Sequence, residues 1–282
     1  MSTHGAGPGG DGSAPGAGLG RFGLRAAALS YLVVFLVLPL AVIVEDGLKD
    51  GLGGLLEGVR QPVAWHALTL TLWTAAVMAA INAVMGTLTA YVLVRYEFPG
   101  RRWLDALVDL PLAVPTLVTG VMLVALYGPQ SALGGWLKSG FGIQVIFAQP
   151  GIVLALLFLT LPLIVRSVQP VLHELDREPE DAAATLGASS FTVFRRVTLP
   201  SLLGPLLTGC LLSFARAIGE FGSIVIVAGN IPLRTQTAAV YVLGEVESDN
   251  RRGASAMSLV LLAITFTLFL VIDRLQRRRG QA

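Results

Sequence analysis

Long apolar runs alternate with short polar segments along this chain and predict a bundle of membrane-spanning helices. A helix needs about 20 apolar residues to cross the hydrocarbon of a bilayer, and six runs approach or exceed that length. The fourth run is slightly short, and the second is long enough to be tilted. The pattern therefore predicts an all-α integral membrane protein with six transmembrane helices, at residues 26–44, 67–94, 107–127, 150–165, 201–228 and 253–272.

The segments outside these runs suggest how the chain is organised. Residues 1–22 are rich in Gly, Ala, Ser and Pro, which predicts a disordered tail without the pattern of a signal peptide. Residues 23–276 are expected to form a single transmembrane domain, followed by a basic tail over residues 277–282. Residues 128–149 contain Gly, Pro, Gln and Lys138 and are expected to form a loop that can hold an interfacial helix.

Composition agrees with a membrane protein and excludes several other classes. Hydrophobic residues make up 54% of the 282 positions and charged residues only 13%, whereas soluble domains carry about 25% charged residues. Mean hydropathy is +0.72. The net charge of +2 is too small to indicate a nucleic-acid partner. Cys210 is the only cysteine, so no disulfide can form within the chain.

No catalytic or metal-binding pattern is present in the sequence. A Walker A loop requires Gly-Lys-Ser/Thr to hold phosphates, and neither lysine of this chain follows a glycine. The histidines His4, His66 and His173 are widely separated and lack the spacing of metal ligands. The chain is therefore expected to have no catalytic residue, no metal site and no bound cofactor, and to depend on a partner or an ion gradient for energy.

The distribution of basic residues predicts the orientation of the spans. Lys and Arg accumulate in cytoplasmic segments of membrane proteins. With the N-terminus inside, thirteen basic residues near the spans fall on the cytoplasmic side and six on the outer side. Both termini are thus expected in the cytoplasm, together with the polar segment between the fourth and fifth spans.

That polar segment, about residues 171–200, has the pattern of two short helices joined by a turn. Pro179 suits the first turn of a helix, and three acidic residues around it favour the positive end of the helix dipole. Gly187 is suited to a left-handed helix end, and Ser189 or Ser190 can cap the next helix. Pro200 is expected to end that second helix.

Two of the predicted spans contain residues that interrupt a regular helix. Pro111 and Pro115 predict a kinked entry into the third span. In the fifth span, Arg216 and Glu220 lie four residues apart and would share one helix face as an ion pair. A charge at mid-membrane costs on the order of 2.5–3.5 kcal/mol, so such residues face protein or water. The functional alternative is a translocation pathway or gate at a helix break, formed by Arg216, Gly219, Glu220 and Gly222.

The polar segment resembles the E-A-A-x3-G-x9-I-x-L-P loop of bacterial ABC importer permeases. The chain departs from that pattern at Asp181 and Val197, which keep the charge and the bulk of the usual residues. In that family the loop is cytoplasmic and inserts into a groove on the ATPase subunit. The resemblance implies that a coupling-helix loop between transmembrane helices 4 and 5 docks the ATPase through Glu180, Asp181, Ala182, Ala183, Gly187, Val197, Leu199 and Pro200.

A second resemblance narrows the substrate. The Gly-Glu-Phe-Gly and Ala-Gly-Asn-Ile-Pro sequences within residues 216–232 resemble permeases of the sulfate and molybdate importers. Residues 110–116 and 166–175 are most similar to the CysT-type sulfate/thiosulfate permeases. The family implies a bacterial cytoplasmic (inner) membrane protein with a paralogous CysW-like second permease and an extracytoplasmic sulfate-binding protein. It also implies two copies of an ATPase that carries ATP-Mg.

Other functions remain open at this point. Molybdate or another oxyanion could replace sulfate as the substrate. An ion-gradient-driven secondary transporter would also suit the intramembrane charges and the Pro-broken third span. The helix–turn–helix shape could belong to a DNA reader, but its first helix begins with three carboxylates and both flanks enter the membrane. The expected partners therefore include the lipid bilayer and no nucleic acid.

Overall fold

The computed structural model describes residues 17–279, and these are almost entirely helical, with no strand among them. The chain divides into two compact units, residues 1–46 and 47–282, which are described separately. The first unit contains α1 (Ala17–Leu32), a π-helical turn (Val33–Val37) and α2 (Leu38–Gly47), which ends at the unit boundary. Residues 1–16 of the predicted tail and residues 280–282 lie outside the described residues.

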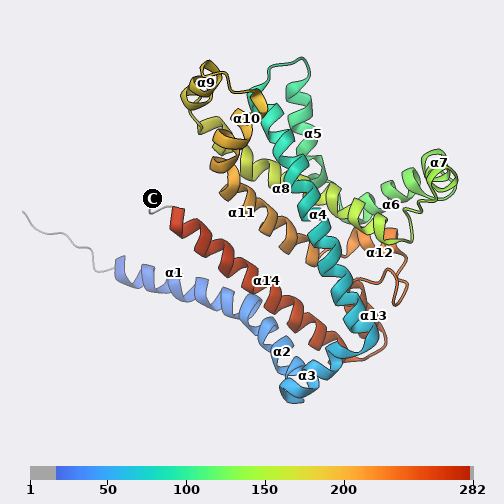
Figure 1. Cartoon of the computed structure of the whole chain (residues 1–282). Coiled ribbons are helices and arrows are strands. Elements are labelled where there is room, and N and C mark those ends of the chain that lie inside the picture. The colour runs from blue at the N-terminus through green and yellow to red at the C-terminus, as the bar shows by residue number, and fades with distance from the viewer. Residues whose placement is uncertain (1–16, 280–282) are drawn as a thin grey trace, which may run out of the picture. The chain divides into compact units, whose positions relative to one another are not determined.

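The second unit is built around four long helices, α4 (Pro62–Arg95), α8 (Gln149–Glu174), α11 (Leu199–Ile218) and α14 (Arg251–Arg279) (Figure 1). The other elements are shorter. They are α3 (Gly51–Arg60), α5 (Arg101–Ala113), α6 (Thr116–Tyr127), α7 (Ala132–Phe141), α9 (Glu178–Thr185), α10 (Ser190–Val193), a π-helical turn η2 (Phe194–Thr198), α12 (Gly222–Ala228) and α13 (Ala238–Glu247).

The prediction of a helical membrane protein is confirmed. Five helical segments among the described residues are long and apolar enough to cross a bilayer, and a bent helix pair would supply a sixth span. The five are Leu24–Gly47, Pro62–Arg95, Gln149–Glu174, Ser190–Ile218 and Arg251–Arg274.

The third predicted span is broken rather than kinked. Helices α5 and α6 meet at 112°, across Val114 and Pro115. Val114 is extended, with φ −81° and ψ 129°, because the ring of a following proline disfavours helical backbone. Pro111 remains inside α5, so it is Pro115 that ends the helix.

The fourth predicted span was too short. Helix α8 continues through Arg166 to Glu174, beyond the predicted end of the span at residue 165. The Arg166 guanidinium donates from Nε to Asp109 Oδ1 at 2.8 Å and from Nη1 to Asp105 Oδ1 at 2.7 Å. Because these carboxylates on α5 compensate its charge, Arg166 does not mark the end of the helix.

The prediction that Pro200 ends a helix is wrong. Residues Ser190–Ile218 run as one helical segment, and Pro200 lies in the first turn of α11. The preceding π turn is wider than an α turn, and the N–H of Leu199 donates to the carbonyl of Phe194. A proline ring crowds the carbonyl four residues earlier, so a wider turn just before it relieves that clash. The same arrangement occurs where the π turn Val33–Val37 precedes Pro39.

The centre of the second unit is the contact of α8 with α4 on one side and α11 on the other. Ile164 of α8 is fully buried between two glycines. A Cβ at Gly86 of α4 would lie 2.8 Å from Ile164 Cγ2, and one at Gly209 of α11 would lie 3.1 Å from Ile164 Cα. Small residues at both contacts let three helices approach closely, as in other membrane bundles.

We expect Gly209→Val to destabilise the protein, because its side chain would collide with the backbone of α8 as well as with Ser167. Overpacking of this kind costs about 1–3 kcal/mol. Thermal denaturation of the purified protein in detergent measures the effect. Gly53→Val in α3 is the matched control, since nothing lies within 4 Å of a Cβ there. Equal stability of the two variants would contradict the packing argument.

Candidate functional site

The α9–α10 segment forms a compact helical hairpin, here called the knob (residues 178–198). Gly187 has φ +84°, as expected for a left-handed helix end. Its N–H donates to Ala184 O at 2.9 Å, and the N–H of Ala188 donates to Ala183 O at 3.1 Å. These two bonds form a Schellman motif, which satisfies carbonyls that the end of α9 leaves free. The turn is therefore closed by its own backbone.

The second helix of the knob starts at a serine cap. Ser189, the first of the two predicted candidates, accepts a hydrogen bond from the N–H of Thr192 at 3.4 Å. The helix then passes through the π turn directly into α11. The knob is thus continuous with a long helix of the bundle, and a displacement of the knob acts on that helix without an intervening loop.

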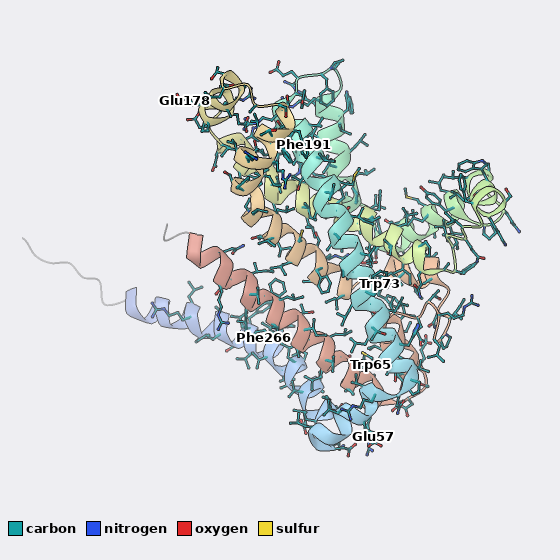
Figure 2. The ribbon with its side chains drawn as sticks, in the orientation of Figure 1. Glu57, Trp65, Trp73, Glu178, Phe191 and Phe266 are labelled. Atoms are coloured by element: carbon teal, nitrogen blue, oxygen red, sulfur yellow. The ribbon has the colours of Figure 1, made fainter. Side chains whose placement is uncertain are left out.

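The residues predicted to dock a partner lie on the knob or in the first turn of α11, and they differ in exposure. Asp181, Ala182, Gly187 and Pro200 are exposed, whereas Glu180, Ala183, Val197 and Leu199 are half-buried. Sequence analysis missed two apolar side chains on this surface, Leu186 and Phe191, which are 88% and 70% exposed. Figure 2 shows Phe191 at the same end of the unit as Glu178. Large apolar side chains exposed together are typical of a contact surface.

The second candidate site is a helix break between α11 and α12. Helix α11 ends at Ile218, so the predicted interruption at residues 219–222 is present. The expectation that Arg216 and Glu220 share one helix face is wrong, since Glu220 lies beyond the helix end. The two side chains nevertheless pair, with Arg216 Nη1 2.7 Å from Glu220 Oε2.

Glu220 is held by more than this ion pair. Its Oε1 accepts hydrogen bonds from both the N–H and the Oγ of Ser223, each at 2.9 Å. The carboxylate therefore caps the first turn of α12 while its other oxygen binds Arg216. The Glu220 side chain is only 3% exposed, whereas that of Arg216 is 44% exposed. The guanidinium keeps donors available to an anion beside the break.

Helices α6 and α12, each of which follows a helix break, contact each other at their first residues. A Cβ at Gly222, the first residue of α12, would lie 2.1 Å from Thr116 Oγ1, the first side chain of α6. One turn later, a Cβ at Gly120 would lie 2.9 Å from Ser223 O. Gly222 is therefore required by packing. Gly219 has no neighbour within 4 Å of a Cβ and no positive φ, so packing does not require glycine there.

Among residues 17–279, no group of three His, Cys, Asp or Glu side chains is close enough to hold a metal ion. The chemistry available at the two sites is a contact surface on the knob and a partly exposed cation at the helix break. Together they suit movement of the helices and passage of an anion.

Residues 82–281 match the family model described as "Binding-protein-dependent transport system inner membrane component". A probable sulfate transport system permease protein cysT of Nephroselmis olivacea is 44% identical over 251 residues, which cover 89% of this chain and 88% of the relative. A sulfate transport system permease protein CysT of Synechocystis sp. is 42% identical over 247 residues, covering 88% of this chain and 86% of the relative.

The fold is also found in a solved structure, the crystal structure of a bacterial ABC transporter involved in the import of the acidic polysaccharide alginate. Its TM-score is 0.74 at 14% identity, covering 92% of this chain and 95% of that one, so the likeness concerns the fold. The family model covers well over half of the sequence, and the relatives share more than 40% identity along nearly all of it. The chain belongs to the family of inner membrane components of binding-protein-dependent transport systems.

Proposed function

We propose that the chain is the membrane-spanning subunit of an ATP-driven importer of sulfate or thiosulfate. The observation that carries this proposal is the 44% and 42% identity to permeases named for sulfate transport, over nearly the whole chain. The partly exposed Arg216 beside a helix break suits a dianionic substrate. Membership of a binding-protein-dependent family argues against a carrier driven by an ion gradient alone.

The subunit itself acts as a non-enzymatic membrane component. We infer that energy comes from two copies of a separate ATPase, which bind ATP-Mg, and that a paralogous CysW-like permease completes the pathway. An extracytoplasmic sulfate-binding protein would deliver the oxyanion. A related fold is known from a bacterial alginate ABC transporter in complex with an alginate pentasaccharide-bound periplasmic protein.

The mechanism that fits these sites is alternating access driven through the knob. Closure of the ATPase dimer on ATP would move the docked knob, whose exposed surface includes Asp181, Leu186 and Phe191. Because the knob continues into α11, its displacement would tilt that helix and carry the break at its far end. Movement at the break would then open or close the route past Arg216.

We further propose that the protein lies in a bacterial cytoplasmic membrane with both termini in the cytoplasm. The excess of basic residues on one side of the spans supports this orientation. An orientation with both termini in the cytoplasm also requires that the bent pair α5–α6 crosses the membrane as one span. If the pair instead entered and left on the same side, the two termini would lie on opposite sides.

Reconstitution in proteoliposomes with the ATPase, the second permease and the sulfate-binding protein tests the function. We expect uptake of labelled sulfate that requires ATP, with excess molybdate competing weakly. Uptake driven by an ion gradient without ATP would contradict the proposal.

Asp181→Lys should reduce co-purification of the ATPase by about tenfold or more, because it reverses the charge of an exposed docking residue. Wild-type co-purification would refute the docking role.

Reporter fusions test the orientation. A reporter fused after Ala282 should be active only in the cytoplasm, and one inserted near Ser139 in α7 should be active only outside. Fusions after Gly100, just before α5, and after Glu247, just before α14, provide matched positions on the opposite side of the bent pair and of the last span. Cytoplasmic activity at Ser139 would show that α5–α6 does not cross the membrane.

The ion pair at the helix break gives a separate prediction. Arg216→Met should lower the free energy of unfolding by about 1–3 kcal/mol, because it leaves the buried Glu220 carboxylate with only its Ser223 donors. Adding Glu220→Gln removes the stranded charge and keeps an oxygen for Ser223, so the double variant should recover stability. If Arg216 attracts the oxyanion, that stable double variant should still import sulfate at least tenfold more slowly. Wild-type uptake at matched expression would show that the pair is only structural.

A further inference from the structure

Two neighbouring carboxylates on α9 face opposite environments. Asp181 is exposed and its side chain makes no hydrogen bond or ion pair among the described residues. The Glu180 side chain is only 13% exposed and turns toward the bundle. Because successive residues of a helix point about 100° apart, the two acids cannot serve the same surface. Only Glu180 is directed at the rest of its own unit.

A single oxygen of Glu180 joins three segments of the chain. Its Oε1 accepts from Arg95 Nη2 at 2.9 Å and from Thr198 Oγ1 at 2.8 Å. Arg95 is the last residue of α4, and Thr198 is the last residue of the π turn that leads into α11. One carboxylate thus ties the first helix of the knob both to the end of α4 and to the start of α11.

The side chains that make these contacts with Glu180 are buried, which strengthens the ion pair and the hydrogen bond. The Arg95 side chain is 8% exposed and Thr198 is fully buried. The Nε of Arg95 is buried without a hydrogen-bond partner. Glu180 is therefore the carboxylate that compensates the guanidinium, and charge-assisted bonds of this kind are stronger than neutral ones. Loss of the Glu180 charge would leave a buried cation uncompensated at the helix end.

A second contact supports the same junction one turn earlier on α4. The rings of Tyr91 and Phe194 lie edge to face, with centroids 5.2 Å apart. Phe194 is the first residue of the π turn, just as Thr198 is its last. The π turn therefore contacts α4 directly at Phe194 and is linked to it through Glu180 at Thr198. Helix α4 in turn packs along α8 and α11 through its buried side chains.

We propose that Glu180 is a positioning residue that locks the knob to the end of α4, so that movement of the knob reaches α4 as well as α11. This inference rests on the proposed function of the knob. It assigns different tasks to the adjacent acids: Asp181 meets the ATPase, and Glu180 transmits the displacement inside the subunit. Without the Glu180 contact, the knob would remain able to dock, but only the Tyr91–Phe194 ring contact would couple its movement to α4.

The positional part of the proposal is tested on the purified chain, without partners. Spin labels at Val92→Cys on α4 and Thr185→Cys on α9, in a Cys210→Ser background, report the distance between the two elements. We expect one narrow distance distribution, and at least a twofold broader one after Glu180→Gln. The matched control is Glu178→Gln, an exposed acid of the same helix, which should leave the distribution narrow. An unchanged distribution in Glu180→Gln would overturn the proposal.

The functional part is tested in the reconstituted transporter. Glu180→Gln should retain the ATPase and its ATP hydrolysis, while the amount of sulfate imported per ATP falls about tenfold. The charge swap Arg95→Glu/Glu180→Arg should restore most of that ratio. A merely structural role would lower the yield of protein but not the ratio. Loss of ATPase co-purification with an unchanged ratio would make Glu180 a docking residue and overturn the proposal.

The two experiments separate this inference from the proposed function. If the wild-type complex imports nothing in response to ATP, the proposed function fails while the spin-label distances still test the tie. If wild-type import depends on ATP but Glu180→Gln imports normally, the function stands and the positioning role fails. Should the charge swap misfold, Arg95→Lys is the second variant. It keeps a cation for Glu180 and should retain at least half of the wild-type ratio.

Discussion

Backbone polar groups at membrane depth must find hydrogen-bond partners within the protein, because hydrocarbon offers none. This constraint determines where the helices of the protein can break. Between α11 and α12, the N–H of Glu220 donates to Ala217 O, and the Glu220 carboxylate accepts the N–H of Ser223. The break is therefore supported by a buried acid that itself needs a cation. The pair of Arg216 with Glu220 follows from the need to end a helix there.

Close packing of small residues places the two breaks together. Apolar side chains gain little from contact with each other in lipid, so helices associate through shape and through small residues. Gly222 and Gly120 let α12 lie against α6, and Gly86 and Gly209 let α4 and α11 enclose Ile164 of α8. The result is a set of close contacts around α8, in which α6 and α12 also contact each other.

Ion pairs in the second unit attach short or irregular segments to the long helices. Arg95 holds α9, Arg166 holds α5, and Arg216 holds the residues before α12. Arg166 binds both Asp105 and Asp109, so the first arm of the bent pair is fixed to α8. Such links are suited to a protein whose parts move as rigid bodies, because each short segment follows the helix to which it is tied.

The sequence by itself determined the class of the protein and the local features of its sites. Some features depend on neighbouring residues only and could therefore be predicted. They are the length of the apolar runs, the glycine at the knob turn, the serine cap and the pairing of Arg216 with Glu220 four residues later. Family resemblance added the docking loop. The tertiary structure alone decided that α8 continues past Arg166, because the compensating carboxylates come from α5. It also decided that α5 and α6 meet at 112° and that Glu180 turns inward while Asp181 turns outward. These three features depend on contacts between residues that are far apart in the sequence, so a local sequence pattern could not predict them.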